Sequence, residues 1–403
     1  MISLKIRWSG SLLFCENINP GIGLWGLAAL CILRKTRKEE EQGMHMADAL
    51  LAPTVAATMY VASGVAAGTS IVNLRKEEAK YSEPLKVKLP AMAVMSALVF
   101  AGQMINYTIP GTGSSGHLCG GMLLSSILGP FAGFLSMIVI LTIQCLFFAD
   151  GGLMALGANV WNMAFYGCFI GYFLIYRPIM HGKLFASKGT KAAIRMKIIV
   201  ASVLGCVVTL QLGAFSVVLE TSLSGITDLP FGAFVALMQP IHLAIGLVEG
   251  VVTAAVLIFV YEARPELLRE VDTAGKIKGK YSFTGTIVIL AIVVAVIGGG
   301  VSLLASSNPD GLEWSLFGNA DAGYSQNMGL NEEDYGVKSS AAQKAEKIQE
   351  KTAILPDYAF SSDQENPAGT SVSGLVGSAI VAAFAILTCL VGGFFRKKKK
   401  SIV

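Results

Sequence analysis

The stretch FVALMQPIHLAIGLVEGVVTAAVLIFVY, residues 234–261, decides the class of fold. It is longer than the roughly 20 apolar residues that a helix needs to cross a bilayer. Its only acidic or basic side chains are His242 and Glu249. In lipid, every backbone N–H and C=O must be bonded within the segment, and an α-helix achieves this. The stretch therefore predicts a transmembrane helix.

The composition of the whole chain agrees with that prediction. Of its 403 residues, 53% are hydrophobic and only 14% are charged, and the mean hydropathy is +0.61. Soluble domains are far less apolar, so we expect an all-α polytopic membrane protein. The net charge of +4 comes mostly from loops and a basic tail, and it does not indicate nucleic-acid binding. Apolar windows predict helices at about 50–74, 88–106, 117–128, 130–149, 155–176, 196–219, 234–261, 283–304 and 373–395.

Lysine and arginine gather in alternate connections between these helices. The basic clusters lie at 75–88, 177–197, 264–280 and 396–400. The positive-inside rule places such clusters in the cytoplasm, so the C-terminus is expected to be cytoplasmic. Met44, the loop at 111–116, the turn at 150–152 and the long segment 305–372 then lie outside the cell.

The predicted helices fall into two units. Residues 44–270 form a seven-helix unit. Residues 281–403 form a two-helix unit whose extracytoplasmic loop, 305–372, carries eleven acidic and four basic residues. This arrangement is typical of two once separate subunits joined in one chain.

Residues 1–43 do not fit this topology. A helix at 11–33 would leave Arg34, Lys35, Arg37 and Lys38 on the outer face, against the positive-inside rule. The segment KEEEQG, residues 38–43, must also have purine-rich codons, like those of a ribosome-binding site just before Met44. We therefore expect 1–43 to be a mis-assigned N-terminal extension. The alternative is an uncleaved signal anchor.

The pair Met44–His45 indicates a metal site. In a chain that begins at Met44, the free α-amine, the His45 amide and the His45 imidazole close fused chelate rings on one ion. His117, which follows the glycine-rich segment at 111–116, supplies a fourth nitrogen in a roughly square-planar set. That geometry suits Ni²⁺ or Cu²⁺, and Co²⁺ less selectively. Because imidazole must be neutral to ligate, binding is expected to weaken below about pH 6.

Simpler interpretations of both histidines stay open. His45 could be a solvated surface residue, and His117 could begin a helix at the membrane interface. The segment GTGSSGH, residues 111–117, also resembles a phosphate loop, but His117-Leu118 replaces the Lys-Ser/Thr of that motif. Without a phosphate loop the chain cannot hydrolyse ATP, so an energising partner is implied.

Other polar residues in the apolar stretches are candidates for supporting roles. His242 and Glu249 lie seven residues apart on one face of a helix, where they either mark a coupling point or satisfy each other or the backbone. Asn159 and Asn162 are expected to orient the site loop rather than to bind metal. A rival interpretation is an intramembrane metalloenzyme that uses His45, His117 and His242 with Glu249 as base. Against it, His242 is expected in the inner or middle part of its helix, away from the other two.

The chain resembles the CbiM/NikM family, the substrate-capturing membrane components of energy-coupling-factor (ECF) transporters for cobalt and nickel. The segment NPDGLEWS, 308–315, with its flanking helices, resembles the small N-type component, so the chain looks like a fusion of the two. The matching CbiM/NikM segments are MHMAD (44–48), NYTIPGTGSSGHL (106–118), FADGGL (148–153), GANVWNM (157–163) and HLAIGLVEG (242–250).

The resemblance implies a multi-pass protein of a bacterial or archaeal plasma membrane. It implies Co²⁺ or Ni²⁺ as the transported substrate, no permanent cofactor, and Met44, His45 and His117 as ligands, with Asp48 holding the loop. A transmembrane coupling protein and cytosolic ATPases would supply energy. Both ions use the same ligands, so neighbouring genes, for cobalamin biosynthesis or a nickel enzyme, are the cheapest way to tell them apart.

Overall fold

The structure is a computed structural model. It describes residues 4–8, 11–15, 45–80, 85–182, 190–225, 230–271, 279–319, 323, 339–360, 363 and 366–400. Residues 1–42 form a unit of their own, in which β1 (Leu4–Trp8) pairs antiparallel with β2 (Ser11–Cys15). The helix considered for 11–33 is thus a strand at its start, and the rest of it lies outside the described residues. Met44 also lies outside them.

Each apolar helix predicted from the sequence is present in the unit that follows. Seven of the helices among the described residues are long and apolar enough to cross a membrane. The chain is therefore an all-α multi-pass membrane protein. The helices are α2 (Pro53–Lys80), α3 (Leu85–Gln103), α4 (Gly121–Leu128), α5 (Pro130–Phe148), α6 (Leu156–Asn159) continued by η2 (Val160–Tyr176) and α7 (Arg177–His181), α8 (Lys191–Ser224), α9 (Phe231–Ala263), α10 (Phe283–Gly299) and α13 (Ala368–Lys400).

Local sequence signals set several helix ends. Thr190 caps α8, because its side chain accepts a hydrogen bond from the Ala193 amide. Ser282 caps α10 in the same way, through the Gly285 amide. The segment η2 is wound as a wide π-helix, and its last turn is closed by a bond from the Arg177 amide to the Tyr172 carbonyl. Such windings are rare and are found frequently at functional sites.

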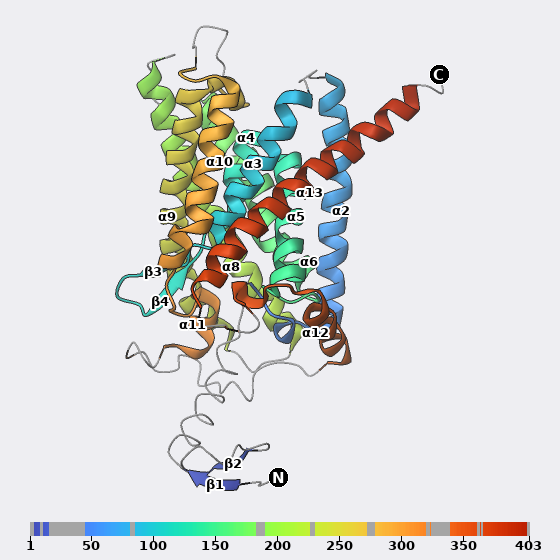
Figure 1. Cartoon of the computed structure of the whole chain (residues 1–403). Coiled ribbons are helices and arrows are strands. Elements are labelled where there is room, and N and C mark those ends of the chain that lie inside the picture. Colours follow the sequence, from blue (N-terminus) through green and yellow to red (C-terminus); the bar gives the residue numbers. More distant parts are fainter. Residues whose placement is uncertain are drawn as a thin grey trace. The chain divides into compact units, whose positions relative to one another are not determined.

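The two helices of the C-terminal unit, residues 281–403, pack on the seven-helix unit, residues 44–270, rather than standing apart from it. Helices α10 and α13 both contact α3, and α13 also contacts α5 (Figure 1). Their backbones come close at Gly298 and Gly374, where a Cβ on Gly374 would lie 2.1 Å from the Gly298 carbonyl oxygen. Small residues allow such close backbone contact between membrane helices.

Polar segments gather at the end of the bundle where α2 begins, opposite the C-terminal end of α13 (Figure 1). The hairpin of β3 (Tyr107–Ile109) and β4 (Ser114–Gly116) lies there. So do α11 (Gly311–Phe317) and α12 (Ser340–Thr352), both within the segment 305–372 that was expected to be a plain polar loop. Asp310 and Ser339 cap these two helices through their side chains. These segments build the end of the molecule that holds the candidate site.

Candidate metal centre

His45 is buried, and the backbone that carries it is held at a fixed depth. Asn159 accepts a hydrogen bond from the Met46 amide at 3.1 Å and donates one to the Met46 carbonyl, also at 3.1 Å. The Gly152 amide donates to the same carbonyl at 3.0 Å. Asn159 therefore orients the segment that carries His45, the role expected for it.

Asp48 holds the same segment against the turn that follows α5. Its Oδ1 accepts a hydrogen bond from the Ala155 amide at 2.8 Å. A Cβ at Gly152 would lie 1.9 Å from this oxygen, so only glycine leaves room for the carboxylate. Burial raises the pKa of Asp48. The glycine turn and the acidic residue thus fit together as one structural unit around His45.

The carboxylate of Asp150 pairs with the ring of His45. Their Oδ1 and Nδ1 atoms lie 2.8 Å apart, and both side chains are almost fully buried. Both ring nitrogens of His45, and Oδ1 of Asp150, are buried with no aligned hydrogen bond among the described residues, so the 2.8 Å approach is an ion-pair contact. A carboxylate on one imidazole nitrogen, with the second left free, is the usual arrangement around a metal-ligating histidine.

His117 meets His45 in the same place. The two imidazole centroids are 5.4 Å apart and the rings are edge to face. His117 directly follows β4, and the loop after it is fixed from α9: Glu249 accepts hydrogen bonds from the Cys119 and Gly120 amides at 2.8 and 2.9 Å. The Glu249 carboxylate therefore serves the backbone at the start of α4.

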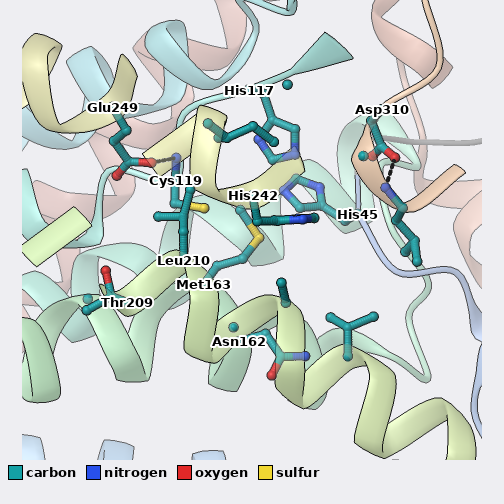
Figure 2. A pocket seen from close by; sticks show the side chains of 18 of the residues that line it. His45, His117, Cys119, Asn162, Met163, Thr209, Leu210, His242, Glu249 and Asp310 are labelled. Atoms are coloured by element: carbon teal, nitrogen blue, oxygen red, sulfur yellow. Dashed lines mark hydrogen bonds between the residues drawn. The ribbon is translucent and has the colours of Figure 1, made fainter. Parts of the chain in front are cut away.

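The histidines face a cavity of about 90 Å³ between the helices (Figure 2). His242, in the first half of α9, lines the same cavity, and its Nδ1 lies 2.8 Å from the Met238 carbonyl oxygen. The expectation that His242 would lie away from His45 and His117 was wrong, because the residues that follow β4 and the first half of α9 line the same cavity as His45. His242 and Glu249 do not bond to each other; each bonds to backbone groups.

Asn162 also lines the cavity but does not serve the His45 segment. Its side chain donates a hydrogen bond to Glu220 on α8 at 2.8 Å. Figure 2 shows it on the far side of the cavity from His117. The role in orienting the site loop, expected for both asparagines, therefore falls to Asn159 and not to Asn162.

The C-terminal unit supplies side chains that the sequence did not single out. Asp310, which caps α11, lines the cavity. Tyr358 donates a hydrogen bond to Oδ2 of Asp150 at 2.6 Å. Gln349 on α12 donates to the Gly151 carbonyl at 2.8 Å. The NPDGLEWS motif was a signal for Asp310, but no pattern marked Tyr358 or Gln349.

The charges of the site follow from burial and from the Asp150 carboxylate. Burial by itself lowers the pKa of His45, but the carboxylates of Asp150 and, less strongly, Asp310 together leave it raised. The His45 ring in turn helps to lower the pKa of Asp150, although burial of that carboxyl group by itself raises it. Burial, with His45 nearby, lowers the pKa of His117. The site therefore offers a neutral imidazole next to one that is paired with a carboxylate.

Side chains alone do not complete a ligand set in this geometry. Across the part of the chain that the structure describes, no group of three His, Cys, Asp or Glu side chains is arranged to hold a metal ion. Two imidazoles are brought together, so further donors must come from the backbone, from other atoms or from solvent.

Comparison with known proteins agrees with these features. The family described as "Cobalt uptake substrate-specific transmembrane region", CbiM, matches residues 45–267, and the PDGLE domain matches residues 284–393. A protein of Archaeoglobus fulgidus named "Putative fused nickel transport protein NikMN" is 33% identical over 84% of this chain and 96% of its own length. The "Fused nickel transport protein NikMN" of Rhodobacter capsulatus is 28% identical over 84% of this chain and 95% of its own length. A crystal structure titled as a truncated transition metal transporter is 31% identical and covers 54% of this chain and 99% of its own, with a TM-score of 0.44.

Proposed function

The chain belongs to the cobalt uptake substrate-specific transmembrane region family, CbiM, with a PDGLE domain in the same chain, and from this premise we propose that it captures Co²⁺ or Ni²⁺ for an importer of the energy-coupling-factor type. It is a transport protein rather than an enzyme. The observation that carries the proposal is that the buried ring of His45 and the half-buried ring of His117 meet edge to face, with Nε2 of His45 unpartnered among the described residues.

The separation of the two rings suits a shared ion. With metal–nitrogen bonds of about 2.0–2.1 Å, two imidazoles on one ion have centroids about 4.5 Å apart when cis and about 6.4 Å apart when trans. The observed 5.4 Å lies between these limits, so a small movement of either ring brings both onto one ion. The ion would then lie at the end of the bundle where α2 begins.

The remaining donors depend on Met44. Where Met44 is the chain terminus, its amine and the His45 amide complete a square-planar set of four nitrogens, which favours Ni²⁺ over most divalent ions. A chelate ring with the His45 amide closes only through Nδ1, the nitrogen that faces Asp150 here. Forming that chelate therefore requires the ring to turn about its Cβ–Cγ bond. Binding through Nε2 requires no such turn.

Transport against a gradient needs energy from partners. We propose a transmembrane coupling protein and cytosolic ATPases, because the sequence has no phosphate loop and residues 111–117 belong to the β3–β4 hairpin and the loop that follows it. The basic clusters, including that at 396–400, favour a cytoplasmic C-terminus in a prokaryotic plasma membrane. The ion would then enter from the side of α11 and α12.

The metalloenzyme alternative loses its base. Glu249 was the general base in that interpretation, but its carboxylate accepts hydrogen bonds from two backbone amides at the start of α4. A carboxylate engaged in this way supports the loop that carries His117. Its side chain lines the cavity, but each of its oxygens already accepts one of these amides.

The proposal is tested by equilibrium binding of Ni²⁺ and Co²⁺ to the full chain purified from native membranes, with Mg²⁺ as the hard-cation control. We expect one ion per chain, no competition from Mg²⁺, and uptake of the ion by cells that also make the coupling protein and ATPases. Intact mass of the same sample decides the donors: a chain starting at Met44 keeps the amine, and a chain starting at Met1 lacks it. Failure of both transition metals to bind would overturn the proposal.

A further inference from the structure

Asp310 brings a carboxylate of the C-terminal unit to the cavity that His45 and His117 line. Its charge reaches both imidazoles: burial lowers the pKa of each ring, and the Asp310 carboxylate is among the charges that oppose this. In Figure 2, Asp310 and Glu249 lie at opposite ends of the cavity, with the histidines between them. The C-terminal unit therefore contributes a side chain to the candidate site itself.

The Asp310 carboxylate has one oxygen that is bonded and one that is not. The amides of Leu312 and Glu313 both donate to Oδ1, at 2.8 and 2.9 Å, which leaves Oδ2 for another partner. None of the ion pairs between described residues includes Asp310. Burial raises the pKa of Asp310, and the two amides and two imidazoles offset this only in part. A cation close to the carboxylate would favour its charged form.

The backbone before Asp310 is held against the strand that leads to His117. Ser115 in β4 donates its amide to the Pro309 carbonyl at 2.8 Å and its hydroxyl to the Asn308 carbonyl at 2.7 Å. Ser115 precedes His117 by two residues, and Pro309 directly precedes Asp310. The imidazole and the carboxylate are thus positioned from neighbouring backbone, although they belong to different units.

Gly311, the residue after Asp310, allows α11 to approach α9 at the cavity. A Cβ at Gly311 would lie 2.7 Å from Cγ2 of Ile241 and 3.1 Å from Cε1 of His242. A larger residue would push α11 away from these α9 side chains. Tight packing therefore brings Asp310 to the cavity, in addition to its role as the cap of α11.

A divalent ion in the cavity needs negative charge nearby, because a buried charge is costly unless it is paired. Imidazole ligands supply none. Two carboxylates line the cavity, those of Glu249 and Asp310. Both oxygens of Glu249 accept backbone amides, whereas Asp310 keeps Oδ2. Asp310 is thus the carboxylate of the cavity that has an oxygen left for a cation.

We propose that Asp310 is the anionic partner of the transported ion: its carboxylate faces the cation held by His45 and His117 and balances part of its charge. This inference rests on the proposed function. It adds that the C-terminal unit supplies charge to a site whose imidazoles come from the first unit. Charge balance of this kind requires no direct bond between the carboxylate and the ion.

Substitution separates the charge of Asp310 from its capping role. Asp310→Asn and Asp310→Ser keep an acceptor for the α11 amides but carry no charge, because Asn, Ser and Asp are about equally good N-caps. Asp310→Ala removes the cap as well. Glu313→Gln is the matched control, since it removes a negative charge three residues further on from a side chain that is not among those lining the cavity.

Titration calorimetry with Ni²⁺ on the full chain measures the affinity, and thermal unfolding without the ion checks that each variant folds. We expect Asp310→Asn and Asp310→Ser to bind Ni²⁺ about 10- to 100-fold more weakly than the wild type, the usual effect of a residue that supports a metal site. Asp310→Ala should bind at least as weakly. Glu313→Gln should change the affinity by less than about twofold, as expected for a charge outside the cavity.

Two results would overturn the inference, and either of the capped variants suffices to obtain them. Wild-type affinity in Asp310→Asn or Asp310→Ser, with a loss only in Asp310→Ala, would reduce Asp310 to a helix cap. An equal loss in Glu313→Gln would show a general effect of negative charge on α11.

The proposed function fails separately from the role of Asp310. If His45→Ala and His117→Ala bind Ni²⁺ like the wild type, the site itself is wrong. If these two variants lose binding while Asp310→Asn and Asp310→Ser keep it, only the role of Asp310 is wrong.

Discussion

The molecule contains the same three kinds of side chain in contact at both of its ends. At the end where α2 begins, Asp150 joins His45 and Tyr358. At the other end of η2 and α9, Glu270 joins His181 and Tyr172. In both places a carboxylate uses one oxygen for an imidazole and the other for a phenol hydroxyl.

The difference between the two clusters is solvent. The side chains of His45 and Asp150 are 2% and 1% exposed, whereas those of His181 and Glu270 are 57% and 11% exposed. Water competes for an exposed pair and screens it, so such pairs contribute little. The comparison teaches that a histidine, a carboxylate and a tyrosine do not make a site by themselves. They make a site where they are buried beside a second imidazole.

Removing an imidazole should produce the largest difference between the two clusters in its effect on the affinity for Ni²⁺. His45→Ala or His117→Ala deletes a ligand, and we expect the affinity for Ni²⁺ to fall by more than about 100-fold, beyond the usual effect of a supporting partner. His181→Ala should bind like the wild type. Titration calorimetry of the three purified variants measures this. Equal losses from all three would mean that burial does not define the site.

Changing the carboxylates should give the next largest contrast. Asp150→Asn keeps the shape but removes the charge that holds the His45 ring, so we expect about a 10- to 100-fold loss of affinity. Glu270→Gln makes the same chemical change in the cluster whose histidine is 57% exposed, and it should alter affinity by less than about twofold, because this cluster has no second imidazole beside it. A tenfold loss in Glu270→Gln would show coupling between the ends that the contacts do not explain.

The pH dependence of binding should sharpen the comparison. A protonated imidazole cannot ligate, so affinity falls as pH falls through the pKa of His45. Asp150 raises that pKa, so the fall should begin at a higher pH than for an ordinary histidine, and above the value of about 6 expected from the sequence. In Asp150→Asn burial, which lowers the pKa of His45, is opposed by the carboxylate of Asp310 but no longer by that of Asp150, and the fall should move to lower pH.

His117 should not determine the pH at which affinity falls. Its pKa is lowered, so its ring stays neutral at a lower pH than the ring of an ordinary histidine. Binding curves from pH 5 to pH 8 for wild type, Asp150→Asn and Glu270→Gln provide the check. We expect Glu270→Gln to follow the wild type. A curve for Asp150→Asn that coincides with the wild type would remove the carboxylate from the explanation.

Among the residues that line the cavity, the smallest effect on the ion is expected from Glu249. Glu249→Gln retains one acceptor for the Cys119 and Gly120 amides and loses the other, a change of about 1–3 kcal/mol in the free energy of unfolding for a buried charged hydrogen bond. Affinity for Ni²⁺ should fall by less than about tenfold, because the loop behind His117 loosens without losing a ligand. Thermal unfolding and calorimetry measure the two quantities. A loss equal to that of His117→Ala would place Glu249 in the site itself.

The sequence was informative wherever a property is local. Each predicted membrane helix is present, because an apolar run of sufficient length has one stable form in lipid. The helices of 305–372 were missed, since they are short, polar and stabilised by caps such as Asp310 and by docking on the first unit. Short helices carry too weak a periodic signal to be recognised against the background of a polar loop.

The candidate site was only partly readable. His45 and His117 could be singled out because a histidine after an internal methionine and one after a glycine-rich loop are distinctive. Asp150 was visible as part of a turn, but its pairing with His45 was not. His242 was expected to lie away from the cavity, and Tyr358 was not considered.

The sequence by itself therefore determined the membrane helices and the histidines that could ligate. Only the tertiary structure decided that Asp150, His242 and Tyr358 meet at one cavity with His45 and His117. The physical reason is that crossing a membrane depends on the hydrophobicity of one continuous segment. The pairing of buried polar groups depends on how segments far apart in sequence dock, and no local pattern records it.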